Sequence, residues 1–148
     1  MCDHPVIAEL SLPSRLGFEK VAMSTAASVA GLMGFSNDRV DDLKTAVAEA
    51  CINAMEHGNQ FQERLAVAVT LTMGRQSLEV TIEDHGTGVN WRPATPDMGL
   101  KMGGAESARG MGLFLIQTLV DEVEFVCGDS RSHARLVIYL NGKESGPA

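Results

Sequence analysis

Two neighbouring segments of the chain alternate apolar and polar side chains with a period of two. Residues 65–73 and residues 77–84 both follow this pattern, and a short turn that contains Gly74 separates them. Because alternate side chains of a strand point to opposite faces, the two segments predict a β-hairpin with one buried face. Such a sheet needs a second layer of secondary structure to cover that face.

Three further segments are expected to extend this sheet. Residues 6–12 alternate in the same way and end at Pro13, which predicts a first strand. Residues 123–127 and 136–140 predict two last strands, joined by a polar turn at residues 128–131. The sheet is therefore expected to contain five strands.

Three other segments favour helices. The first covers residues 16–33 and is rich in small residues. The second is capped by Ser36 or Asn37 and is expected to run to His57, and the third covers residues 110–121. The pattern that predicts the first helix consists of Leu16, Val21, Met23 or Ser24, Ala27 or Ser28, and Leu32.

The order of these segments predicts an α/β fold. It is a two-layer sandwich in which three helices cover one face of a mixed, mostly antiparallel sheet. At 148 residues the chain can bury one core but is too short for two ordinary domains, so we expect a single domain over residues 1–148. The glycine-rich segment 85–108 lacks an apolar period and is expected to be a mobile loop.

The composition argues against several classes of protein. Twelve basic and nineteen acidic residues give a net charge of −7, which disfavours binding to nucleic acid. No apolar run approaches the roughly 20 residues of a membrane span, and the chain does not start like a secreted protein, so we expect a cytoplasmic location with no membrane contact. Cys2, Cys51 and Cys127 are far apart and do not form a metal-binding pattern, so we interpret them as buried or incidental thiols.

The second predicted helix carries a polar stripe. Glu49, Asn53 and His57 follow one another at intervals of four residues and therefore align along one face, with Asp42 on the same stripe. In an ordinary amphipathic helix such a stripe is a solvated face. Here the neighbouring residues are small, which leaves room for a ligand close to the helix. These small neighbours are Ala46, Ala48, Ala50 and Ala54.

A second motif follows the hairpin. Asp84 ends an apolar strand and precedes Gly86 and Gly88, which permit positive φ angles and a close approach of the backbone to a ligand. Alone, an acid beside glycines is more often only part of a turn. Its position between the polar stripe and the third motif favours a binding site.

The third motif, Gly110-Met111-Gly112-Leu113, is expected to open the third helix. Free backbone N–H groups and the helix dipole favour phosphate at such a position, although close packing would also explain the two glycines. The motif is neither a P-loop nor a Rossmann fingerprint, because the lysine of the former and the third glycine of the latter are absent.

These three motifs, in this order, resemble those of the GHKL superfamily of ATPases and kinases. Residues 43–58 resemble the corresponding helix of its small anti-sigma-factor serine-protein kinases, and the resemblance extends through nearly the whole chain. It implies the Bergerat ATP-binding fold, with ATP and Mg²⁺ as cofactors. It also implies that residues 85–108 form the lid over the nucleotide.

The resemblance assigns roles to individual residues. Glu49 matches the general base and Asn53 the Mg²⁺ ligand, which suits a carboxylate and an amide oxygen. Asp84 matches the acceptor for the exocyclic amine of adenine, and Arg109 the contact to the terminal phosphate. The family has a Gly-Thr pair near the last strand, for which Ser132 is the candidate replacement. The remaining residues expected to bind the nucleotide are His57, Gly86, Gly88, Lys101, Gly110, Met111, Gly112 and Leu113.

The function implied by the resemblance is that of an ATP-dependent serine/threonine-protein kinase. Such a kinase phosphorylates an anti-sigma factor antagonist of the STAS type, binds a sigma factor, and forms a homodimer. One alternative is an ATP-gated binding module without efficient phosphotransfer. Another is the catalytic domain of a histidine kinase, but none of the four histidines lies on a long helix ahead of the ATP-binding motifs.

Overall fold

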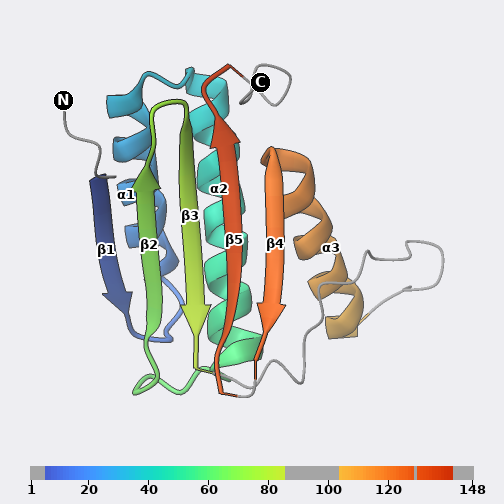
Figure 1. The fold of residues 1–148 in the computed structure, drawn as a ribbon. Coiled ribbons are helices and arrows are strands. Elements are labelled where there is room, and N and C mark those ends of the chain that lie inside the picture. The colour runs from blue at the N-terminus through green and yellow to red at the C-terminus, as the bar shows by residue number, and fades with distance from the viewer. Residues whose placement is uncertain (1–5, 86–103, 129, 142–148) are drawn as a thin grey trace.

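The computed structural model of this chain is a sandwich of two layers, with helices covering one face of a five-stranded sheet (Figure 1). The structure describes residues 6–85, 104–128 and 130–141, and it describes residues 104–111 by their backbone alone. The fold class predicted from the sequence is confirmed.

The sheet has the order β1-β2-β3-β5-β4, and every neighbouring pair of described strands is antiparallel. The predicted hairpin forms β2 and β3, while β5 begins at Ser132, four residues before its predicted start. Pairing with β3 on one side and β4 on the other draws residues 132–135 into the sheet. The strands are β1 (Val6–Leu12), β2 (Val67–Met73), β3 (Ser77–Asp84), β4 (Glu122–Cys127) and β5 (Ser132–Tyr139).

The helical layer contains α1 (Glu19–Met33), α2 (Asn37–Asn53), the short η1 (Ala54–Gly58) and α3 (Gly104–Leu119). The Ser36 hydroxyl accepts a hydrogen bond from the Arg39 N–H at 3.3 Å, which confirms the predicted start of α2. The helix α1 ends at Gly34, whose φ of +96° is the left-handed conformation that favours glycine. In the described part of the chain, no helix is both long and apolar enough to span a membrane.

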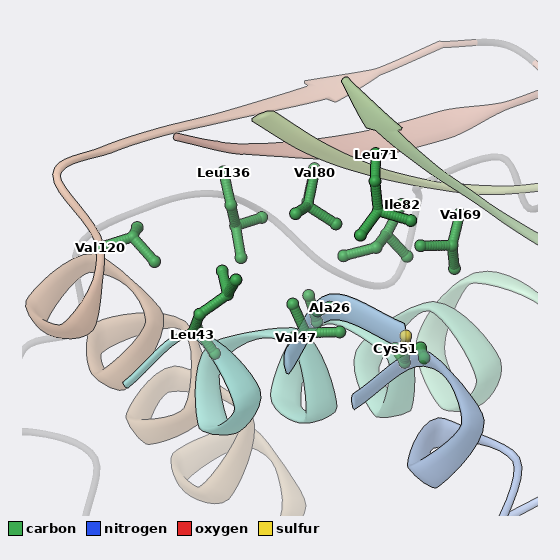
Figure 2. Packing of buried hydrophobic residues seen from close by; sticks show 14 of the residues in the cluster. Ala26, Leu43, Val47, Cys51, Val69, Leu71, Val80, Ile82, Val120 and Leu136 are labelled. Carbon is green, nitrogen blue, oxygen red and sulfur yellow. The ribbon is translucent and has the colours of Figure 1, made fainter. Parts of the chain in front are cut away.

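The core lies between α2 and the covered face of the sheet. Leu43 and Val47 of α2 point toward Val80 of β3 and Leu136 of β5 (Figure 2), and all four side chains are fully buried. Cys51 lies on the same side of α2, and burial raises the pKa of its thiol to about 12. Cys51 is therefore a core thiol without nucleophilic character, while Cys127 is exposed.

The predicted pattern for the first helix selects the wrong face. Val21 is 43% exposed and Leu32 is 86% exposed. The buried positions of α1 are Ala22, Ala26, Val29 and Ala30. Small side chains let two helix backbones approach closely, and α1 packs mainly against α2, so three alanines and Val29 lie on its buried face in place of Val21 and Leu32.

A large side chain on this face should be poorly tolerated. We expect Ala26→Leu to lower the free energy of unfolding by about 1–3 kcal/mol, because the extra volume has no space between α1 and the core. Ser28→Leu adds comparable volume at an exposed position of the same helix, and its effect should stay within about 0.5 kcal/mol. Urea denaturation compares the two variants, and equal midpoints would show that the contact is not tight.

The third helix, α3, starts at Gly104, six residues before the predicted start at Gly110. Residues 105–109, Ala-Glu-Ser-Ala-Arg, include four good helix formers and extend the helix back to Gly104. Gly110 and Gly112 therefore lie inside α3 and not at its N-terminus, where the phosphate contact was expected. Residues 104–108 also leave the predicted loop 85–108 and join the helix.

Candidate functional site

The end of α2 departs from the predicted regular helix. The Asn59 N–H donates to the Ala54 carbonyl, five residues back, at 2.9 Å, and this is the hydrogen-bond pattern of a π-helix. This π turn lies between Asn53 and His57, so the last interval of the predicted stripe is not a regular α-helical turn. The His57 Nε2 lies 3.6 Å from the Glu56 Oε1. Such π turns are frequent at functional sites.

Glu49 and Asn53 face α3 at Gly112. A Cβ atom added to Gly112 would lie 2.9 Å from the Glu49 Oε1 and 3.9 Å from the Asn53 Nδ2. Glycine at this position therefore allows the α3 backbone to pass close to both side chains. Close packing is thus one reason for a glycine at residue 112. Asn53 is 8% exposed, and its Nδ2 has no hydrogen-bond partner within the described residues. A buried polar atom without a partner is rare and indicates a place for a ligand or water.

Asp84 lies at the end of β3 with its carboxylate against η1, and it is 1% exposed. A Cβ atom added to Gly58 would overlap this carboxylate, with its Oδ1 only 2.6 Å away. The missing side chain of Gly58 thus provides the space in which the carboxylate lies.

Ser132 lies directly beside Asp84. The two residues are paired in the β3–β5 register, and Ser132 is 1% exposed. Its hydroxyl oxygen lacks a hydrogen-bond partner in the described part of the chain. Ser132, the candidate replacement for the Gly-Thr pair near the last strand, is the first residue of β5 and lies next to the predicted adenine acceptor.

The structure thus forms two clusters. Asp84, Ser132 and Gly58 meet at the end of the sheet, while Glu49 and Asn53 meet Gly112 between α2 and α3. Because Asn53 directly precedes η1 and Gly58 ends it, one turn of helix connects the two clusters. An acceptor at one end and a base with an amide at the other could bind the two ends of a nucleotide.

The other predicted residues divide into three groups. Leu113 is 3% exposed and packs in the core beside Ile116, so the structure gives it a packing role. The backbones of Arg109, Gly110 and Met111 belong to α3, but the side chains of Arg109 and Met111 lie outside the described part of the structure. The predicted positions wholly outside the described residues are Gly86, Gly88 and Lys101.

Sequence reasoning missed two residues of this region. Gly58 and Asn59 directly follow His57, the predicted end of the second helix, and were given no role in the site, yet Gly58 contacts Asp84 and Asn59 is completely buried. An asparagine immediately after a polar helix end is usually exposed, so the sequence gives little signal for its burial.

Three comparisons identify relatives of this chain. Residues 12–138 match the family model described as the histidine kinase-like ATPase domain. Serine-protein kinase RsbW of Bacillus velezensis is 32% identical over 139 residues, which cover 91% of this chain and 86% of that protein. RsbW of Bacillus subtilis and RsbW of Listeria monocytogenes are each 31% identical over 91% of this chain, and they are covered to 86% and 88%.

A solved structure agrees with the fold. The crystal structure of the RsbU and RsbW domains of a Mycobacterium tuberculosis protein superimposes with a TM-score of 0.66 at 15% identity, over 91% of this chain and 32% of that chain. The family is an ATPase domain, which implies that its members bind ATP. The chain therefore belongs to the histidine kinase-like ATPase domain family and, within it, to the RsbW serine-protein kinases.

Proposed function

We propose that this protein transfers phosphate from ATP to a serine or threonine of a small antagonist protein, and that it also acts as an anti-sigma factor. The observation that carries the proposal is the meeting of Glu49 and Asn53 with Gly112, one helical turn from the Asp84 carboxylate. The relatives that are serine-protein kinases support the type of reaction.

The adenine base is proposed to bind at Asp84. The carboxylate would accept a hydrogen bond from the exocyclic amine of adenine, whereas guanine has a carbonyl oxygen at that position and would face the negative charge. Ser132 supports this assignment, because its buried hydroxyl lies next to Asp84 and lacks a partner among the described residues. We propose that Ser132 replaces the threonine of the Gly-Thr pair and contacts the base directly or through water.

Asn53 is proposed to hold Mg²⁺ through its amide oxygen. The amide nitrogen has no hydrogen-bond partner in the described residues. The side chain can therefore rotate to direct its oxygen at an ion without losing a hydrogen bond from the nitrogen. One protein oxygen suits Mg²⁺, which keeps several waters and binds largely through phosphate oxygens. When bound, the ion would neutralise phosphate charge in a protein whose net charge is −7.

Removal of this amide tests the Mg²⁺ assignment. Asn53→Ala should lower the affinity for ATP in the presence of Mg²⁺ on the order of 10- to 100-fold, since changes at metal sites have effects of this size. Calorimetric titrations with Mg²⁺ and with a chelator measure the difference, and Thr45→Ala on the exposed side of α2 is the control. A variant that keeps the wild-type dependence on Mg²⁺ would contradict the assignment.

Glu49 is proposed to act as the general base. Its carboxylate would accept the proton of the substrate hydroxyl while the hydroxyl oxygen attacks the γ-phosphorus and ADP leaves. The half-buried position of Glu49 against α3 supports this role, because a base must be held near the reacting atoms. Arg109, which lies one residue before Gly110 on α3, is proposed to stabilise the charge of the transferring phosphate.

The proposed protein partners are those expected for a member of this family. We propose a STAS-type antagonist as the substrate, a sigma factor as a second partner, and a cytoplasmic homodimer.

Incubation with γ-labelled ATP and a candidate antagonist should give a label that resists acid, as phosphoserine does. An acid-labile label would favour the histidine-kinase alternative, and binding without label would favour the ATP-gated module. Affinity purification from the host with ATP and with ADP tests the sigma factor.

A further inference from the structure

The Asp84 carboxylate occupies space that exists only because residue 58 has no side chain. A Cβ atom at Gly58 would overlap all three terminal atoms of the Asp84 side chain, with 2.6 Å to the Oδ1 as the longest of the three distances. Real Cβ atoms do not approach other atoms so closely, so an alanine at residue 58 requires the carboxylate or the helix to move. Gly58 has this position because η1 brings its backbone under the end of β3.

Asn59, which follows Gly58, holds the backbone at His85, the residue after Asp84. Its Oδ1 accepts a hydrogen bond from the His85 N–H at 2.8 Å, and His85 directly follows Asp84. Its Nδ2 donates to the Ser14 Oγ at 2.8 Å and to the carbonyls of Leu65 and Ala66 at 3.0 and 3.1 Å. One buried amide thus connects the end of β1, the start of β2 and the end of β3.

The chain turns sharply just after this amide. Gln60 and Phe61 have φ angles of +53° and +56°, which are uncommon for residues with side chains. The Phe61 N–H donates to the Met55 carbonyl at 2.7 Å and so ties the turn to η1. Asn59 is therefore held between the π turn and a constrained turn, and both limit its freedom to move.

We infer that Gly58 and Asn59 are positioning residues for base recognition by Asp84. This inference rests on the proposed function. Gly58 leaves free the volume in which the carboxylate lies, and Asn59 holds the backbone at the residue after it. A hydrogen bond selects one base over another only if its acceptor is fixed, because a mobile carboxylate would adapt to other groups.

A double-mutant cycle tests the contact without any nucleotide. Gly58→Ala should lower the urea midpoint strongly in the wild-type background and much less in the Asp84→Ala background, because Asp84→Ala removes the atoms that the new Cβ meets. Gly31→Ala is the control, since its Cβ meets no atom within 4 Å and its effect should be equal in both backgrounds. If Gly58→Ala alone does not fold, the double variant should fold. Additive effects, or a double variant that also fails to fold, would overturn the contact.

The role of Asn59 is tested by base preference. Asn59→Ala should weaken ADP binding by about 10-fold or more and narrow the preference for ADP over GDP, since a fixed acceptor is lost. Ser14→Ala removes a different hydrogen bond of the same amide, so it should lower the urea midpoint but keep the preference. A folded Asn59→Ala protein with the wild-type preference would refute the role of Asn59.

Hydrogen exchange gives a measurement that needs no variant. His85 is exposed, but its N–H is bonded to a fully buried amide, so it should exchange as slowly as the amides of β3. Fast exchange at His85 would show that Asn59 does not hold the chain there. If wild-type protein binds no ADP, the proposed function itself fails, whereas ADP binding together with an additive cycle rejects only the positioning role of Gly58.

Discussion

Asp84→Ala is expected to lower the affinity for ADP and ATP by about 10- to 150-fold in a protein that remains folded. A hydrogen bond to a charged group contributes about 1.5–3 kcal/mol, and this carboxylate is the proposed acceptor for the adenine amine. The carboxylate is 1% exposed, so water cannot replace it without entering a closed part of the structure. The substitution removes no apolar volume from the core.

Calorimetry of ADP binding measures this effect, and a neighbouring acid provides the matched control. Glu83 precedes Asp84 on β3 and points to the opposite face of the sheet, where its Oε1 lies 4.0 Å from the Arg131 Nη1. Glu83→Ala removes the same charge from the same strand and should bind ADP like the wild type. An Asp84→Ala protein with wild-type affinity and an intact fold would eliminate Asp84 as the adenine acceptor.

The second large effect is expected at Glu49. Glu49→Gln should lower the rate of phosphotransfer to the antagonist by about 10²- to 10⁴-fold, because the amide cannot accept the proton of the attacking hydroxyl. ATP binding should change little, since the proposed contacts to the base and to Mg²⁺ come from other residues. A single-turnover phosphorylation assay, run beside a binding titration, separates the two quantities.

A control for Glu49 is present on the same helix. Asp42 lies on the predicted polar stripe, is partly exposed, and forms an ion pair with Arg39 at 3.6 Å. Asp42→Asn makes the same change from acid to amide and should keep the wild-type rate. If Glu49→Gln also keeps that rate, the protein has no general base at residue 49, and the ATP-gated binding module becomes the better interpretation.

Local patterns predicted most of the fold, and they failed where packing depends on something other than large apolar residues. The alternation in β2 and β3 and the serine cap of α2 are local features, and both were predicted. The start of α3 was missed because residues 104–109 contain no apolar period, although their intrinsic helix propensity is high. The buried face of α1 was missed because its contact uses alanines, which give a weak pattern.

In the candidate site, too, local patterns predicted some contacts and missed others. Glu49 and Asn53 lie one helical turn apart, so their proximity follows from the sequence alone. The contact between Gly58 and Asp84 joins residues that are far apart in the chain. Asp84 and Ser132, which pair across β3 and β5, are even farther apart in the chain. No local period encodes such contacts, since they depend on how the π turn and the strands meet.

The order of the strands has a consequence for how the length of the segment between β3 and α3 can vary. The chain leaves the sheet after Asp84, forms α3 and then the edge strand β4 (Figure 1), and only afterwards reaches Ser132 of β5, which pairs with Asp84. The antiparallel ladder between β3 and β5 therefore holds Asp84 and Ser132 side by side whatever the length of the segment between β3 and α3. Because closing a longer loop costs only about 0.6 kcal/mol for each doubling of its length, insertions or deletions between β3 and α3 can change that segment while Asp84 and Ser132 keep their register.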